Sequence, residues 1–249
     1  MEIKEIIIKI IKKIEKEENI KVLFLIESGS RAWGWESEDS DYDVRGVFIQ
    51  DYLVVEEVKG QIERKIDNLD ITLWDLRKFL SLMKKSNPSV WEWLSSDIIY
   101  MENPLRKRLK YIYERDFNSL KLKKHYVSMA KQNFHKYINE VGDTANLKKY
   151  VYVLRSVACV LWIEKNKTPP QKDYKKVIKL FPNNIKKFFE KVVADKRKSE
   201  NLEGKRNKEI ERYVISFFDK SFDEDKDKFD IGELNKIFKR SIKNGNHNP

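Results

Sequence analysis

The sequence lacks the residues on which disulfides and zinc sites depend. Among its 249 residues there are one cysteine, Cys159, and three histidines. A single cysteine excludes an internal disulfide, and so few cysteines and histidines argue against a structural zinc site. Cysteine this scarce suits a reducing compartment, and we therefore expect a cytoplasmic protein.

Long apolar runs are also missing. In the first half of the chain the longest uninterrupted run is Val22 to Ile26, far below the ~20 residues that a membrane span needs. The chain begins Met-Glu-Ile-Lys-Glu, without the basic segment and apolar run of a secretory signal. Neither a signal peptide nor a membrane partner is expected.

The composition is nevertheless that of a folded protein with an uneven charge. Hydrophobic residues make up 41% and aromatics 12%, which is too much for a disordered chain. Residues 1–100 hold 15 Lys+Arg and 20 Asp+Glu, whereas the remainder holds 36 and 20. A basic second part is the expected footprint of a nucleic-acid partner, although Lys-rich helices with solvated faces have the same composition.

The first part of the chain has the patterns of both helices and strands. Ile3, Ile7, Ile10 and Ile14 recur at the spacing of an amphipathic helix. The expected elements are a helix over 2–18, strands at 21–26 and 42–49, a hairpin of 62–66 and 69–73, and a helix over 74–85 with Asp75 as its cap.

From about residue 119 onward only helices are expected, interrupted at Thr168-Pro169-Pro170. The predicted helices cover 122–137, 147–164, 177–193, 208–222 and 231–242, and 195–206 is expected to be an exposed loop. The predicted fold class is α+β. A small mixed β-sheet domain with flanking helices spans 1–118, and an all-α, basic, substrate-binding domain spans 119–249.

Two aspartates mark the chemistry of the first domain. Asp41 and Asp43 stand at i and i+2 at the start of a strand, so both carboxylates project from one face. Two such carboxylates repel unless a cation lies between them. Mg²⁺ takes oxygen ligands and commonly combines carboxylates with phosphate oxygens.

A glycine-serine pair precedes them. Gly29 and Ser30 end the first strand and open a helix, where a backbone without a side chain can approach a phosphate and free N–H groups attract anions. Ser30 adds a hydroxyl and Arg31 a positive charge. A triphosphate held there could be bridged by metals on Asp41 and Asp43, which fits phosphoryl or nucleotidyl transfer with two metal ions.

A third carboxylate usually completes such a site. Asp70 is the candidate because it lies within a predicted hairpin strand, whereas Asp67 lies in the turn and Asp75 on the following helix. Arg45 shares the face of Asp43, and it either contacts a phosphate or neutralises the carboxylates.

The second domain offers a further polar face. Lys148, Tyr152 and Arg155 fall at i, i+4 and i+7 of a predicted helix, so one face carries two cations and an aromatic ring. This face either binds nucleotide phosphates or is solvated. Trp33 either stacks on a base or packs in the core, and packing is the favoured interpretation.

These residues resemble the polymerase-beta-type nucleotidyltransferase superfamily, and the sequence looks closest to its RNA-repair-pathway, RNA-ligase-associated branch (RlaP-like, YcgL-like). The matching segments are Gly-Ser-Arg-Ala-Trp-Gly at 29–34 and Asp-Ser-Asp-Tyr-Asp-Val-Arg-Gly-Val-Phe at 39–48. The match continues in Asp70-Ile71, 74–78, Asn87-Pro88, 92–94, 148–150 and Leu154-Arg155. The resemblance covers roughly residues 20–165.

The resemblance implies a mixed sheet with flanking helices, followed by a helical domain. It implies transfer of a nucleoside monophosphate from a nucleoside triphosphate to an acceptor hydroxyl, with release of pyrophosphate. By motif, Gly29 and Ser30 are similar to the phosphate-cradling pair, and Asp41 and Asp43 to the metal ligands. Asp70 follows less directly, because the third acid lies at a variable distance. The expected cofactor is Mg²⁺, as two ions, with Mn²⁺ as a substitute.

The association of this family with RNA ligases suggests an RNA acceptor, such as a tRNA-like 3′ end. Two alternatives stay open. The acceptor hydroxyl could belong to a protein or a small molecule, for which the basic second part is not needed. A non-catalytic RNA-binding module is the other alternative, and it predicts loss of the acids or of Gly-Ser, both of which are present here.

Overall fold

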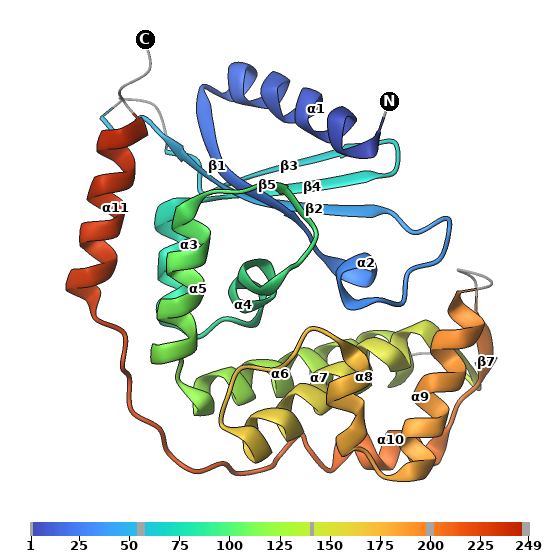
Figure 1. The fold of residues 1–249 in the computed structure, drawn as a ribbon. Coiled ribbons are helices and arrows are strands. Elements are labelled where there is room, and N and C mark those ends of the chain that lie inside the picture. Colours follow the sequence, from blue (N-terminus) through green and yellow to red (C-terminus); the bar gives the residue numbers. More distant parts are fainter. Residues whose placement is uncertain (1, 54–57, 140–141, 198–201, 246–249) are drawn as a thin grey trace. The chain divides into compact units, whose positions relative to one another are not determined.

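The computed structural model describes residues 2–53, 58–139, 142–197 and 202–245 (Figure 1). The contacts within the chain form two compact units. The first comprises Met1–Ala32, Asp41–Phe117 and Lys228–Pro249, and the second comprises Trp33–Ser40 and Asn118–Asp227. This grouping is discontinuous, whereas the sequence suggested one division at residue 118. The domain limits 1–118 and 119–249 stay a prediction.

The first unit is built on a five-stranded mixed sheet in the order β3-β4-β2-β1-β5. The pair β2–β4 is parallel, and the pairs β1–β2, β3–β4 and β1–β5 are antiparallel. The strands are β1 (Ile20–Glu27), β2 (Tyr42–Gln50), β3 (Gln61–Ile66), β4 (Leu69–Asp75) and β5 (Ile99–Met101). The expected α+β class with a mixed sheet is confirmed.

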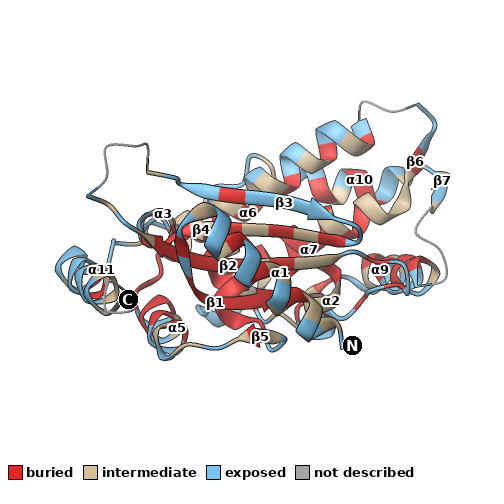
Figure 2. Ribbon diagram, turned by 90° about the horizontal axis from the view of Figure 1, so that it is seen from above, coloured by how far each residue is buried: buried red, intermediate tan, exposed pale blue. Residues whose placement is uncertain are grey.

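Helices cover both faces of this sheet (Figure 1). On one face, α1 (Ile3–Glu18) buries Ile7, Ile11 and Ile14. Ile7 and Ile14 belong to the predicted face, whereas Ile3 and Ile10 are only half-buried. On the other face lie α3 (Leu76–Lys84), α4 (Pro88–Ser95), α5 (Pro104–Asp116) and α11 (Ile231–Gly245). Figure 2 shows that the central strands β1 and β2 are mostly buried.

Side-chain caps set several helix starts in the first unit. The Asp75 carboxylate accepts from the backbone N–H of Arg77 at 2.8 Å, so Asp75 ends β4 and begins α3, as expected of a capping acid. Asn103 and Pro104 begin α5 in the same way. The sequence analysis expected no helix in this region.

The second unit is mainly helical. Its helices are α6 (Ser119–Phe134), the π-helix η1 (His135–Asn139), α7 (Leu147–Asn166), α8 (Tyr174–Val177), the 3₁₀-helix η2 (Ile178–Leu180), α9 (Asn183–Lys196) and α10 (Lys208–Ile215). The short α2 (Gly29–Trp33) begins in the first unit, and its last residue groups with the second.

Three details of the second unit differ from the sequence analysis, of which the first is that the helix expected over 208–222 ends at Ile215. The strands β6 (Thr144–Asn146) and β7 (Glu203–Lys205) form a short ladder in a region expected to be purely helical. The helix expected over 177–193 begins only at Asn183, because Pro182 has the extended ψ of 149° and cannot continue a helix. Among the described residues, no helix has the length and apolarity needed to cross a membrane.

Candidate active site

The turn after β1 lies directly against the Asp43 side chain. The Ser28 N–H donates to the Asp43 carbonyl at 2.8 Å, which joins the end of β1 to the start of β2. Gly29 has a φ of +61°, and a β-carbon there would lie 1.8 Å from Asp43 Oδ2. Only glycine fits, both for its backbone conformation and for the space beside it. The backbone of the Gly-Ser pair therefore reaches a carboxylate with no side chain between them.

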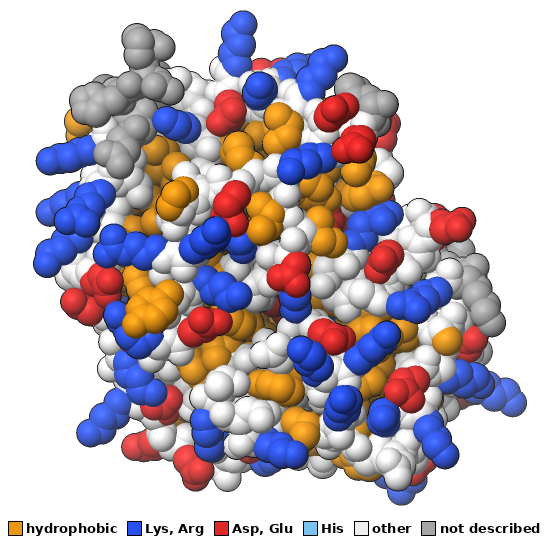
Figure 3. Space-filling model, in the orientation of Figure 1, with side chains coloured by type: hydrophobic (Ala, Val, Ile, Leu, Met, Phe, Trp, Pro, Cys, Tyr) orange, Lys and Arg blue, Asp and Glu red, His pale blue; other side chains and the backbone are white. Residues whose placement is uncertain are grey.

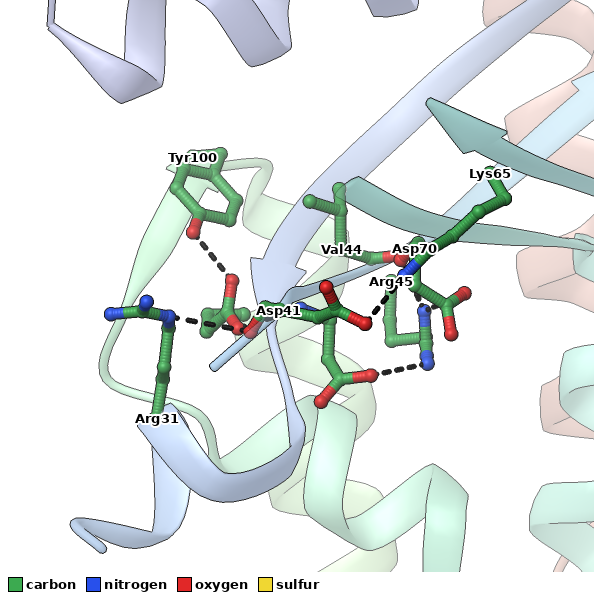
Figure 4. Close-up of polar contacts among 9 residues, drawn as sticks. Arg31, Asp41, Val44, Arg45, Lys65, Asp70 and Tyr100 are labelled. Atoms are coloured by element: carbon green, nitrogen blue, oxygen red, sulfur yellow. Dashed lines mark hydrogen bonds and ion pairs between the residues drawn. The ribbon is translucent and has the colours of Figure 1, made fainter. Parts of the chain in front are cut away.

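Strand pairing brings a second carboxylate beside Asp43. In the parallel pair β2–β4, Asp43 is in register with Asp70, so the two side chains lie on one face of the sheet. Asp41 precedes β2 by one residue. The exposed fractions of these side chains are 51% for Asp41, 27% for Asp43 and 45% for Asp70. The three acids predicted from the sequence thus lie at the starts of β2 and β4, where Figure 4 shows Asp41 and Asp70.

Two basic side chains contact these acids. Arg45 Nη2 donates to Asp43 Oδ1 at 2.8 Å, and Nη1 donates to Asp70 Oδ1 at 3.1 Å and to the Asp70 carbonyl at 2.5 Å. Lys65 forms an ion pair with Asp41. Arg45 was expected either to contact a phosphate or to neutralise the carboxylates, and in the structure it pairs with the carboxylates of Asp43 and Asp70 (Figure 4).

The other acids near the hairpin have different surroundings. Asp67 is exposed in the turn between β3 and β4, with a φ of +49°. Asp75 is buried, caps α3 and accepts hydrogen bonds from Gln50 and Tyr52 at 2.9 and 2.6 Å. Of the three candidates, only Asp70 is in register with Asp43.

A buried glutamate that the sequence analysis missed accepts a hydrogen bond from the backbone of Asp43. Glu27, the last residue of β1, is 0% exposed. It accepts from the Asp43 backbone N–H at 2.8 Å and from the Tyr100 hydroxyl at 2.5 Å. Burial raises the pKa of Glu27 to about 7, against the lowering effect of both hydrogen bonds. The sequence did contain a signal for Glu27, because this acidic residue directly follows the apolar run Val22 to Ile26.

The electrostatics of Asp43 show the cost of gathering these acids. Burial raises the pKa of Asp43, Arg45 lowers it, and the charges of Asp70 and Asp41 raise it again. An additional cation at the carboxylates would favour the ionised form of Asp43.

The donor set suits a hard divalent cation, because it consists of carboxylate oxygens beside a glycine backbone. Within the described part of the chain, however, no group of three or more His, Cys, Asp or Glu residues is arranged to hold a metal ion. Arg45 and Lys65 contact the carboxylate oxygens that a metal would use. The residues fit Mg²⁺ in chemistry, and binding it requires these two basic side chains to move.

The remaining residues of the predicted phosphate turn have defined contacts. Ser30 is buried in α2, a helix of five residues. The Arg31 guanidinium lies 3.9 Å from the centre of the Tyr42 ring, and its Nε donates to the Asp41 carbonyl at 3.3 Å. Arg31 therefore joins α2 to the start of β2.

In the second unit, the residues predicted on α7 meet an aromatic cluster. Arg155 is only 5% exposed, and its guanidinium lies 3.9 Å from the centre of the Trp33 ring. Trp33 also meets Tyr152 edge to face, with ring centres 6.0 Å apart. The interpretation of this helix face as solvated is therefore wrong for Arg155. Lys148 is half-buried in the first turn of α7.

The chain is similar in sequence to a described family and to a protein of a known bacterium. The family described as "RNA repair pathway DNA polymerase beta family" matches residues 3–240. A protein of Bacillus subtilis (strain 168) named "Uncharacterized protein YcgL" is 39% identical over 207 residues, which are 80% of this chain and 79% of that protein.

A solved structure, the nucleotidyltransferase-like protein from Exiguobacterium sibiricum 255-15, matches at 13% identity. The match covers 93% of this chain and 90% of that one, with a TM-score of 0.29. The family match spans the positions of the Gly-Ser pair and of all three acids. The chain belongs to the RNA repair pathway DNA polymerase beta family and is a nucleotidyltransferase.

Proposed function

We propose that this enzyme transfers a nucleoside monophosphate from a nucleoside triphosphate to a hydroxyl at an RNA end. The observation that carries the proposal is the approach of the Gly29 backbone to the Asp43 carboxylate, where a β-carbon would lie 1.8 Å from Oδ2. A phosphate chain over that turn would lie beside the carboxylates of Asp43 and Asp70.

Asp41, Asp43 and Asp70 would hold the divalent cation. Bound Mg²⁺ would neutralise the phosphate oxygens and activate the acceptor hydroxyl. Arg45 and Lys65 would release the carboxylates and become available to phosphate oxygens, for which a guanidinium is well suited.

The transfer itself requires one bond to form and one to break. The acceptor oxygen forms a bond to the α-phosphorus, and the bond from that phosphorus to the pyrophosphate oxygen breaks. The proton of the hydroxyl goes to a carboxylate, and we assign this role to Asp70, which is half-exposed and in register with Asp43.

Two observations support RNA as the acceptor. The matching family is described as acting in an RNA repair pathway. Residues 101–249 hold 36 Lys+Arg against 20 Asp+Glu, a balance that favours a polyanionic partner. The Lys148, Tyr152 and Arg155 face of the second unit stays a predicted phosphate-binding face.

The test is a transfer assay with each α-³²P-labelled nucleoside triphosphate, Mg²⁺, and total small RNA in one set only. We expect label in RNA with the wild type and none with Asp41→Asn/Asp43→Asn. The matched control is Asp67→Asn, an exposed acid on the adjoining turn. Label found only in protein would replace RNA by a protein acceptor. Tight RNA binding without transfer of any nucleotide would indicate a binding module instead.

A further inference from the structure

A basic groove lies in the first unit at the end of the sheet away from the carboxylates. The start of β1, the end of β2, the start of α5 and one face of α11 line it, and its volume is about 470 Å³. Ile49 on β2 lines the groove, and it is six residues from Asp43, roughly 20 Å along a strand. The groove is therefore separate from the site described above.

Positive charge in this groove is incompletely balanced. Lys21, Arg108 and Arg240 line it, and among the residues that the structure describes no acidic one does. Within the described ranges, neither Lys21 nor Arg240 forms an ion pair. Arg108 contacts Glu233 at 3.5 Å, but Glu233 is also bound by Arg115 at the shorter distance of 2.8 Å.

Figure 3 shows basic side chains gathered along the edge formed by α11. Three cations from β1, α5 and α11 thus meet at one groove, although these elements are distant in the sequence. All three side chains are exposed, so water screens their mutual repulsion, and an anion in the groove would be attracted to all three.

The groove also has an apolar floor. Leu23, Ile49 and Ile237 line it and are themselves buried. Its volume is within the range of roughly 300–1,000 Å³ for small-molecule sites, and an inorganic anion would leave most of it unfilled. Guanidinium groups match the geometry of phosphate oxygens, and a lysine adds a point charge. The lining therefore suits a phosphate joined to a partly apolar group such as a nucleoside.

We propose that this groove is a second binding site, which takes a phosphorylated nucleoside through Lys21, Arg108 and Arg240. The ligand is either a free nucleoside monophosphate or the phosphorylated terminal nucleotide of an RNA. The chemistry is the same in both cases, and the site does not depend on the proposed transfer reaction.

The experiment is calorimetric titration of the full chain at fixed ionic strength in EDTA, with AMP, adenosine and a short 5′-phosphorylated RNA as probes. The variants are Arg240→Glu and Lys21→Glu/Arg240→Glu. Lys239→Glu is the matched control, because Lys239 is exposed on the same helix but does not line the groove. Arg240→Gln and thermal unfolding of each variant separate loss of binding from loss of folding.

We expect AMP or the RNA to bind the wild type. Arg240→Glu should weaken this binding by about 10-fold or more, and Lys239→Glu by less than about twofold. Asp41→Asn/Asp43→Asn should leave it unchanged. Binding of AMP identifies the free nucleotide as the ligand, and binding of the RNA alone identifies a nucleic-acid end.

Four results would overturn the proposal. These are the absence of binding by every probe at millimolar concentration, equal binding of adenosine and AMP, equal weakening in Arg240→Glu and Lys239→Glu, and loss of binding in the aspartate variant. The last result would assign the ligand to the carboxylate site.

Discussion

The backbone of Gly29 packs directly against the side chain of Asp43. A β-carbon on Gly29 would lie 1.8 Å from Asp43 Oδ2 and 2.6 Å from its carboxyl carbon. The residue that turns the chain after β1 therefore also fixes the position of the carboxylate on β2. Any larger residue at position 29 must move either the turn or the acid.

Gly29→Ala should consequently lower both the rate of nucleotidyl transfer and the stability of the protein. Displacing a reacting group by about 1 Å can cost on the order of 100-fold in rate, while a positive φ costs an alanine about 1–2 kcal/mol of folding free energy. Gly34→Ala is the control, because Gly34 also has a positive φ, +84°, but no atom lies within 4 Å of its β-carbon position. Transfer rates and urea unfolding should be measured for both. Equal losses of activity would show that backbone strain, and not the contact with Asp43, is responsible.

Arg45→Met should destabilise the protein and strengthen its binding of divalent cations. Burial raises the pKa of Asp43, and Arg45 lowers it. Loss of Arg45 would leave the Asp43 and Asp70 carboxylates facing each other without a cation, which should cost about 1–2 kcal/mol of folding free energy. The same change removes the cation that competes with a metal for Asp43 and Asp70. Unfolding in EDTA and titration with Mn²⁺ would measure the two effects separately.

Lys65→Met provides the comparison for Arg45→Met. The ion pair of Lys65 with Asp41 is more than half exposed on both sides, so its loss should change stability by less than about 0.5 kcal/mol. If Mn²⁺ binds Arg45→Met no more tightly than the wild type, Arg45 does not compete with a metal at these acids.

Arg155→Lys should weaken the second unit. A lysine keeps the charge but loses the planar stacking of the guanidinium on Trp33, which lies 3.9 Å away. We expect a loss of about 1 kcal/mol in stability, measured by thermal unfolding. Lys165→Arg, an exposed substitution near the end of the same helix, should have no measurable effect. Unchanged unfolding of Arg155→Lys would show that its charge alone is needed beside Trp33.

Local signals were enough to predict much of the first unit. The isoleucine spacing predicted α1, Asp67-Asn68 predicted the turn of the β3–β4 hairpin, and Asp75 predicted the cap of α3. Each depends on residues within one element or on its immediate neighbours. Asp70 was predicted as part of the site because only it lies inside a hairpin strand, and its register with Asp43 agrees with that choice.

The missed features depend on residues far apart in the chain. The hydrogen bond between Glu27 and Tyr100 joins residues 73 positions apart, and nothing near Glu27 in the sequence points to β5. The grouping of Lys228–Pro249 with the first unit depends on contacts of α11 with α3 and β2. An amphipathic pattern predicts a helix but does not identify the surface on which it packs.

The buried Glu27 should make the stability of the protein fall as the pH rises. Its pKa is raised from 4.5 to about 7 in the folded chain, so the folded state holds a proton that the unfolded state has already lost. This contribution is complete below about pH 4.5 and is lost as the pH rises through about 7. The expected loss is on the order of 3 kcal/mol between these limits.

Glu27→Gln should remove this pH dependence, because the amide does not titrate. Its oxygen can accept from the Asp43 N–H while its NH2 group donates to the Tyr100 hydroxyl oxygen. Urea unfolding in EDTA at pH 5, 6, 7 and 8 would measure it. Since Asp43 is present in both proteins, the difference between the wild type and the variant isolates Glu27. Glu63→Gln, an exposed acid on β3, is the control and should retain the slope of the wild type. A slope that persists in Glu27→Gln would mean that Glu27 is already ionised in the folded chain, and that its two hydrogen bonds outweigh its burial.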